Sequence, residues 1–232
     1  MSAHSARILP DGDAARAEAV NLLRGGGIVA VPTDTVYGIA ADMALPDAIE
    51  RLFAAKRRPP EKAVAVLLAD VSQAEALGEM SPAARVLGER FWPGGLTLVL
   101  PLRSGVHLPR VLAGGAQTIG VHLPRVLAGG AQTIGVRVPD HPAPRALAAI
   151  LGPLPTTSAN VSGEPDARDA QEIAGRLGEA LALVIDGGPI RGGLASTVVD
   201  CTGERPVVRR LGAIPEAEIA RALAEAGLEL GS

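Results

Sequence analysis

The sequence predicts an α/β protein whose open, twisted, mixed sheet is flanked by helices. Short β-branched or aliphatic runs alternate with Ala- and Leu-rich segments of helical period, which favours strands and helices interleaved along one chain. The alternation is not strictly βαβ, so a mixed sheet is expected rather than a purely parallel one. Hydrophobic residues make up 47% of the 232 residues but aromatic residues only 2%, so an aliphatic core has to fill the space between the layers.

The N-terminal elements follow from spacing and from helix breakers. Ala14 to Arg24 carries apolar residues at helical intervals and stops at Gly25–Gly27. Ile28–Val31 is a short β-branched strand. A second helix starts at Pro46, where the missing N–H costs nothing, and runs to about Lys56. Pro59 and Pro60 prevent its continuation.

The middle of the chain continues this alternation. Val64–Leu68 is a continuous apolar run, typical of a strand covered on both faces. Ser81 and Pro82 open a helix that ends near Trp92, and Leu96–Leu100 is the next strand. Thr133–Val138 is expected to be a strand and Ala143–Leu151 a helix.

The C-terminal third predicts six more elements and no linker, so we expect one domain. Thr156–Asn160 is a strand end that leads into a polar turn. Asp169–Leu177 is helical, and the strand Leu181–Ile185 stops at Asp186–Gly188. The last expected elements are the strands Ser196–Cys201 and Pro206–Arg210 and the helix Pro215–Ala226.

A tandem duplication interrupts this pattern. Gly105–Ile119 is repeated without change as Gly120–Ile134. Two copies are too few for a solenoid, so one copy has to loop out, which long connections tolerate. We expect the second copy to stay in the sheet, because it runs directly into the following strand. If the first copy took that strand, His122 would stand where Arg137 does, and activity would be lost.

Charge and composition exclude several classes of protein. The net charge of −3 and the pI near 5.8 argue against a wholly basic nucleic-acid binder. The interval Arg90–Pro139 nevertheless has no acidic residue and carries five arginines, so it could favour a polyanion or be balanced by the acidic segments around it. The lone Cys201 reads as a small core residue. With no signal-like segment in Met1–Gly12 and no membrane-length apolar run, we expect a cytoplasmic protein.

The two lysines of the chain, Lys56 and Lys62, occur in one short stretch, although arginine fills every other basic position. Lysine is a compact ammonium and arginine a planar fork, and they do not substitute freely at a site. Just upstream, Pro32–Gly38 places hydroxyl side chains at a strand end. These features suggest a pocket for a nucleotide or another phosphate-bearing ligand; a solvated basic helix end is the alternative.

A second strand end combines polar side chains in the same way. Ser158 and Asn160 are two residues apart, so on an extended backbone both point to one side. A local turn stabilised by these side chains is the alternative. Thr133 and Arg137, four residues apart, also share one strand face. No phosphate-binding glycine motif and no metal-spaced His or Cys set occurs, and we expect no protein metal site.

Six motifs occur in one order along the chain: Gly26–Gly38 (GGIVAVPTDTVYG), Lys56–Arg58 (KRR), Phe91–Thr97 (FWPGGLT), Gly135–Pro139 (GVRVP), Ser158–Asn160 (SAN) and Ser196–Val199 (STVV). Together they resemble the YrdC/Sua5 family, the L-threonylcarbamoyladenylate synthases of the short type. The resemblance implies a YrdC-like catalytic domain over residues 10–215, which includes the duplication, followed by a C-terminal helix and tail at 216–232.

The resemblance also implies a reaction. L-threonine and bicarbonate form an N-carboxy-threonine, whose carboxylate attacks the α-phosphate of ATP, and threonylcarbamoyl-AMP and pyrophosphate result. Mg²⁺ is expected to accompany the ATP. A partner transferase complex then uses the product to make N6-threonylcarbamoyladenosine beside the anticodon of tRNA.

Matching position by position implies the following roles. The expected L-threonine ligands are Thr35, Arg137, Ser158 and Ser196. The expected ATP ligands are Arg58, Lys62, Thr133, Asn160 and Arg210. Lys56 and Arg58 are the expected catalytic cations, because charge near the phosphates can offset the charge that develops as pyrophosphate leaves.

Two alternatives remain at this point. The first is a non-catalytic relative of the same fold that binds double-stranded RNA or tRNA, which the acid-free arginine stretch favours and the acidic overall balance opposes. The second is a carbamoyl-transferring relative with another acceptor, which the lack of accessory domains and zinc-type cysteines opposes.

Overall fold

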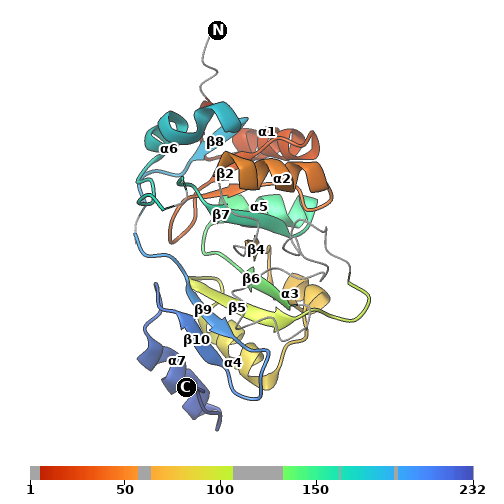
Figure 1. Ribbon diagram of the computed structural model, residues 1–232, viewed down its shortest axis with the longest axis vertical. Coiled ribbons are helices and arrows are strands. Elements are labelled where there is room, and N and C mark those ends of the chain that lie inside the picture. The colour runs from red at the N-terminus through yellow and green to blue at the C-terminus, as the bar shows by residue number, and fades with distance from the viewer. Residues whose placement is uncertain (1–5, 57–63, 107–132, 162, 191–192, 232) are drawn as a thin grey trace.

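The computed structural model describes residues 6–56, 64–106, 133–161, 163–190 and 193–231. Their backbone forms a twisted sheet of ten strands that runs the length of the molecule, with helices packed against it (Figure 1). The strands are β1 (Arg7–Pro10), β2 (Val29–Val31), β3 (Gly38–Ala40), β4 (Ala65–Leu67), β5 (Leu96–Pro101), β6 (Thr133–Arg137), β7 (Leu154–Ser158), β8 (Leu183–Asp186), β9 (Thr197–Asp200) and β10 (Val207–Arg210). The α-helices are α1 (Asp13–Arg24), α2 (Pro46–Ala55), α3 (Val71–Leu77), α4 (Pro82–Phe91), α5 (Pro142–Leu151), α6 (Ala170–Leu177) and α7 (Glu216–Glu225).

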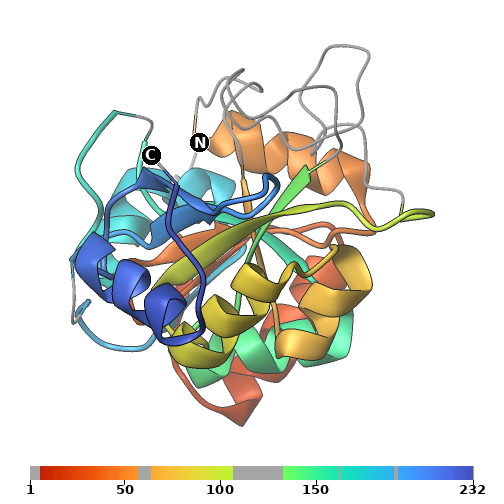
Figure 2. The ribbon, with the colours of Figure 1, turned by 90° about the horizontal axis from the view of Figure 1, so that it is seen from below.

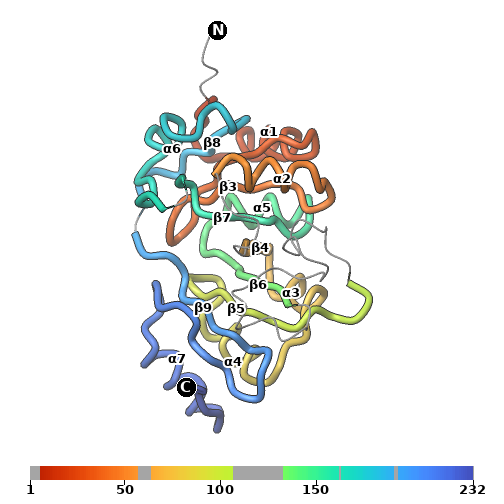
Figure 3. The backbone as a smooth tube through the Cα atoms, in the orientation of Figure 1, coloured from red at the N-terminus to blue at the C-terminus, as the bar shows by residue number. Residues whose placement is uncertain are grey.

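The sheet is mixed, as the sequence predicts. Its strand order is β1-β8-β2-β3-β7-β4-β6-β5-β9-β10, with parallel pairs at β1–β8, β8–β2, β4–β6 and β5–β9 and antiparallel pairs elsewhere. Strands that are distant in sequence therefore lie side by side, and the smoothed backbone shows β8 returning beside the early strands (Figure 3). In the centre of the sheet, Leu67 of β4 is paired with Arg137 of β6.

Two apolar clusters cover the two faces of the sheet. Along β8, Leu183 and Ile185 belong to one cluster and Val184 to the other, as the alternation of side chains on a strand requires. Helices α1 and α5 pack on the first cluster, whereas α2, α4, α6 and α7 contribute to the second. The view from below shows helices on both sides of the strands (Figure 2).

Helix starts follow their capping residues. The Ser81 side chain accepts a hydrogen bond from the Ala84 amide, and the Asp169 carboxylate accepts one from the Glu172 amide. Pro46 occupies the first turn of α2, as expected. The predicted strand and helix positions are confirmed to within a few residues in the described ranges, while Pro59 and Pro60 lie outside them.

Three elements were not predicted from the sequence: β1, β3 and α3. β1 and β3 have four and three residues, too few for a period of two to be recognised. α3 has seven residues and is capped by Asp70, whose side chain accepts hydrogen bonds from two backbone amides. The Asp70 carboxylate has a lowered pKa, because the Ser72 hydroxyl and these amides stabilise its charge.

The prediction that the second repeat copy stays in the sheet is confirmed for its last two residues. Thr133 and Ile134 open β6 and pair with Pro101 and Leu100 of β5. The Ile134 side chain is fully buried in the core. The segment 107–132, which holds most of both copies, lies outside the described residues.

No helix in the described parts of the chain is long and apolar enough to cross a membrane. Cys201 is buried in the core, as predicted, and burial raises the pKa of its thiol to about 12.

The identical copies offer a matched test of the strand register. Because Ile134 is fully buried, Ile134→Ala is expected to lower the free energy of unfolding by roughly 2–5 kcal/mol. The same change at Ile119, which has the same sequence around it, is the control and is expected to cost much less. Urea unfolding of both variants checks this; a larger loss at Ile119 would show that the first copy forms the strand.

Candidate active site

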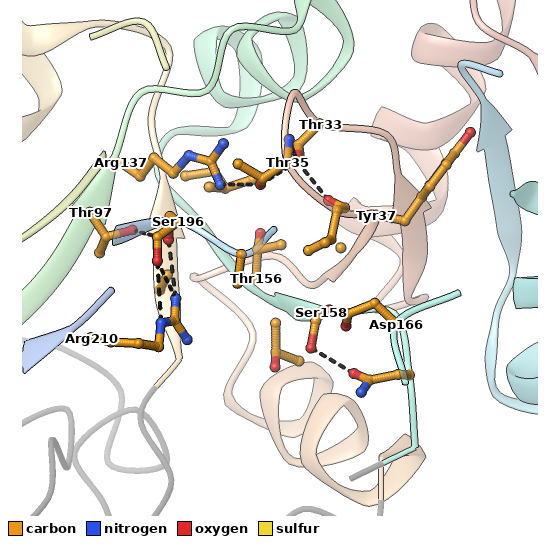
Figure 4. A pocket seen from close by; sticks show the side chains of 17 residues that line it. Thr33, Thr35, Tyr37, Thr97, Arg137, Thr156, Ser158, Asp166, Ser196 and Arg210 are labelled. Atoms are coloured by element: carbon orange, nitrogen blue, oxygen red, sulfur yellow. Dashed lines mark hydrogen bonds between the residues drawn. The ribbon is translucent and has the colours of Figure 1, made fainter. Parts of the chain in front are cut away.

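A cavity of about 300 Å³ opens at the centre of the sheet, where the ends of several strands meet. Its walls come from segments far apart in the sequence, and the side chains converge from several directions (Figure 4). The lining residues are Thr33, Thr35, Val36, Tyr37, Gly38, Ala65, Leu67, Thr97, Arg137, Thr156, Thr157, Ser158, Asn160, Asp166, Ala195, Ser196 and Arg210. This concentration of hydroxyl, guanidinium and amide groups suits a polar, charged ligand.

Arg137 dominates one wall. Its guanidinium donates from Nη1 to Thr35 Oγ1 at 2.7 Å, from Nη2 to Asp34 Oδ1 at 2.6 Å and from Nε to the Gly94 carbonyl at 2.9 Å. Burial lowers the pKa of Arg137, and the neighbouring Asp34 carboxylate offsets part of that effect. Contacts with the described residues use three of the five N–H groups of this guanidinium, and the other two can bind a carboxylate or phosphate oxygen.

The loop between β2 and β3 is shaped by its own hydroxyls. Thr33 Oγ1 accepts from the Thr35 amide at 3.1 Å and donates to the Val36 carbonyl at 2.6 Å. This local turn holds the Thr35 hydroxyl against Arg137. Gly38 begins β3 where β7 approaches closely: a Cβ there would lie 2.5 Å from Thr156 Cγ2. The glycine that ends the first motif is thus required by packing at the floor of the cavity.

Lys56 is the centre of a second group of hydrogen bonds, beside the cavity. It lies just after α2 and is only 1% exposed. Four oxygen atoms of the described residues lie within hydrogen-bond distance of its Nζ, at 2.5–3.2 Å, and share its three N–H donors: Thr157 Oγ1, the Ser158 carbonyl, Ser158 Oγ and Asn160 Oδ1. Ser158 Oγ also donates to Asn160 Oδ1 at 2.6 Å. The buried ammonium therefore holds the end of β7 and the turn after it in one arrangement, and it brings a positive charge to this wall.

A third group of polar side chains joins β5, β9 and β10. Ser196 Oγ and Thr97 Oγ1 are hydrogen-bonded at 2.8 Å, and the Arg210 guanidinium donates to the Ser196 carbonyl and hydroxyl. Burial lowers the pKa of Arg210, while the charge of Asp166 acts in the opposite direction. Gly212 permits this close approach, since a Cβ at that position would collide with the Ala195 carbonyl.

Tyr37 closes the remaining side. Its hydroxyl donates to the Gly188 carbonyl at 2.7 Å and accepts from the Gly187 amide at 3.0 Å. Burial raises the pKa of the Tyr37 phenol to about 12. These bonds tie the first motif to the turn after β8.

Nearby, Trp92 is buried, and its indole N–H donates to the Leu96 carbonyl at 2.7 Å. This places it next to the turn whose Gly94 carbonyl accepts from Arg137.

The structure brings together most of the residues that the sequence singled out. Thr35, Arg137, Ser158, Asn160, Ser196 and Arg210 all line the cavity, and Lys56 contacts its wall. Thr133 opens β6 at 3% exposure but is not part of the lining. Arg58 and Lys62 lie outside the described residues. The ligand roles of all these residues stay predictions.

Sequence reasoning missed several site residues. Asp34 and Thr33 lie inside the first motif and could have been found from its polar density. Tyr37 and Thr97 also lie inside motifs found in the sequence but were not singled out there. Asp166 carried no signal, because its place at the cavity depends on how the strands are ordered. Within the described ranges, no three His, Cys, Asp or Glu side chains gather in a way that could hold a metal ion.

A comparison with known protein families shows the family of this chain. A sequence profile of the Sua5/YciO/YrdC family, described as telomere recombination, matches residues 21–212. The chain belongs to this family.

Single members of the family are similar to this chain over most of its length. The chain is 38% identical over 205 residues to the threonylcarbamoyl-AMP synthase of Bacillus subtilis, covering 88% of this chain and 55% of that protein. The crystal structure of Pyrococcus abyssi Sua5 complexed with L-threonine has a TM-score of 0.80 and 33% identity, and the match covers 97% of this chain and 61% of that one. The chain thus spans little more than half the length of these relatives. Escherichia coli YciO is similar over 93% of this chain and 98% of its own, with a TM-score of 0.74 and 27% identity.

The Asp34–Arg137 ion pair is expected to be essential for stability. Asp34→Asn removes the negative charge opposite a guanidinium whose side chain is only 6% exposed, so the free energy of unfolding is expected to fall by about 3 kcal/mol. Urea unfolding measures this. Asp140→Asn, an exposed carboxylate in the segment after β6, is the matched control. Equal, small effects of both changes would mean that Arg137 does not depend on its partner.

The single tyrosine of the chain allows a direct pH test. Because the folded state holds the phenolic proton of Tyr37 more tightly, with a pKa raised from 10.0 to about 12, its contribution to stability is complete below pH 10 and is lost as the pH rises towards 12. Ultraviolet absorbance of the phenolate is expected to show a higher titration midpoint in the native protein than in denaturant. Coinciding midpoints would contradict the burial of this hydroxyl.

Proposed function

We propose that this protein makes threonylcarbamoyl-AMP from L-threonine, bicarbonate and ATP. The observation that carries the proposal is the meeting of two groups at one cavity. The Arg137–Thr35 pair lines it, and so do Ser158 and Asn160 of the Lys56–Ser158–Asn160 cluster, with Lys56 bonded to them from the wall. The first group is suited to a carboxylate and the second brings positive charge for a phosphate. Membership of the family, the name of the Bacillus subtilis relative and the L-threonine in the Pyrococcus abyssi complex support this reading.

In this reaction the protein has to position the two reactants and does not have to supply a nucleophile. The amino group of threonine reacts with bicarbonate to give N-carboxy-threonine and water. One carboxylate oxygen of that carbamate then forms a bond to the α-phosphorus of ATP, the bond to the β-phosphate oxygen breaks, and pyrophosphate leaves. Because the substrate supplies the nucleophile, the protein contributes by aligning the two reactants and by stabilising charge.

Each group of residues has a task in this scheme. Arg137 and Thr35, with Ser158 and Ser196, bind the amino acid. Asn160 and Arg210, with Arg58, Lys62 and Thr133, bind the nucleotide. Lys56 and Arg58 offset the charge that grows on the phosphates as the bond breaks.

Mg²⁺ is expected to enter with ATP, since it prefers phosphate oxygens and water to dedicated protein cages. Threonylcarbamoyl-AMP would pass to a transferase complex that modifies adenosine in tRNA, in the cytoplasm. The catalytic unit in this proposal is residues 10–215, with 216–232 as a C-terminal helix and tail.

Pyrophosphate release from ATP, with bicarbonate and with or without L-threonine, tests the proposal. Threonine-dependent release is expected. Arg210→Ala removes a cation of the cavity and is expected to lower kcat/KM for ATP by about tenfold to a hundredfold. The adjacent Arg209→Ala is the matched control, because Arg209 pairs with Asp200 and does not line the cavity.

Two results would overturn this proposal. Folded protein that releases no pyrophosphate in the presence of threonine lacks the activity. Salt-dependent binding of RNA without ATP turnover would instead favour the non-catalytic RNA-binding alternative.

A further inference from the structure

One charged residue of the cavity lining has no task in the scheme above. Among the described residues that line the cavity, Asp166 is the one with a carboxylate. No hydrogen bond or ion pair engages that carboxylate within the described parts of the chain, although Arg210 lies close enough to feel its charge. In Figure 4 the Asp166 side chain lies on the Ser158 side of the cavity, with Arg137 on the other side. A carboxylate in a cavity proposed to take ATP needs an explanation, since it repels phosphate.

The backbone around Asp166 is held firmly. Arg176 of α6 donates to the Pro165 carbonyl at 2.8 Å, and Asn160 Nδ2 donates to the Glu164 carbonyl at 2.6 Å. Three residues further on, Asp169 caps α6. The backbone on either side of Asp166 is therefore held in place, which lowers the cost of ordering this segment around a ligand.

Charge decides which part of a nucleotide can meet this carboxylate. In the scheme above Arg137 binds the amino acid, and the positive side chains left for the phosphates among the described residues are Arg210, in the cavity lining, and Lys56, which contacts the wall. Asp166 then faces a neutral part of the nucleotide that can donate hydrogen bonds. The α-phosphate has to lie in the cavity next to the amino acid, and the ribose is the group attached directly to it. Vicinal ribose hydroxyls are good donors to a carboxylate, which commonly reads them in nucleotide-binding proteins.

We propose that Asp166 accepts hydrogen bonds from the ribose hydroxyls of the nucleotide and makes the site selective for ribonucleotides over deoxyribonucleotides. This inference rests on the proposed function only in taking ATP as the nucleotide. Asp166 is a specificity-determining residue here and takes no part in bond making.

Direct binding tests the inference without turnover. Calorimetric titration of ATP, 2′-deoxy-ATP and 3′-deoxy-ATP, with no threonine present, is made on the full chain and on Asp166→Asn and Asp166→Ala. The wild-type protein is expected to prefer ATP over at least one deoxy analogue by about tenfold to a hundredfold, the range of a hydrogen bond to a charged group. In both variants that ratio is expected to fall towards one, mainly through weaker binding of ATP. Glu164→Gln is the matched control, because this carboxylate lies in the same loop, 4.0 Å from Arg176, and does not line the cavity.

The possible outcomes separate the two proposals. An unchanged preference for ribose in folded Asp166 variants overturns the inference alone. The inference is also overturned if the Asp166 variants no longer distinguish ATP from purine riboside triphosphate, which lacks the adenine amino group, but still prefer ribose. In that case the carboxylate recognises the base and not the ribose. Asp166-dependent ribose selectivity in a chain without threonine-dependent pyrophosphate release supports the inference and overturns the synthase proposal. A chain that binds no nucleotide overturns both.

Discussion

The burial of one guanidinium organises this site. Arg137 lies at the end of a central strand, almost without exposure, and its charge is tolerated because Asp34, Thr35 and the Gly94 carbonyl surround it. These partners come from the loop after β2 and from the turn before β5, so the ion pair connects three segments that are distant in sequence. A buried cation without such partners would be strongly destabilising, and each of these segments is constrained by the need to satisfy it.

The Lys56 ammonium plays a corresponding part on the other wall. It collects a carbonyl, two hydroxyls and an amide oxygen from the end of β7 and the turn that follows. The two buried cations thus order opposite walls of one cavity, and both depend on hydroxyl residues at strand ends. Polar side chains that elsewhere would be exposed are here part of the internal framework, which explains why the lining is so rich in threonine and serine.

The sequence was informative where a local rule decides the structure. Pro46, Ser81 and Asp169 marked helix starts correctly because capping is a property of a few adjacent residues. The site motifs were found because hydroxyl and charged residues follow aliphatic strands. Asp34 was passed over although it lies inside the first motif and contacts Arg137. Asp166 was not singled out, because only the strand order brings this carboxylate near Arg210. The sheet order itself depends on pairing between segments far apart, such as β1 with β8, for which the pattern of single strands carries no signal.

The placement of Trp92 gives the molecule a built-in optical reporter. It is the one tryptophan of the chain, it is buried, and its indole is fixed to the Leu96 carbonyl beside the turn whose Gly94 carbonyl holds Arg137. Indole emission depends on the polarity and the electric field around the ring. Intrinsic fluorescence of the unlabelled protein should therefore follow rearrangements of the arginine wall in real time, which would make the order of ligand arrival accessible to stopped-flow mixing.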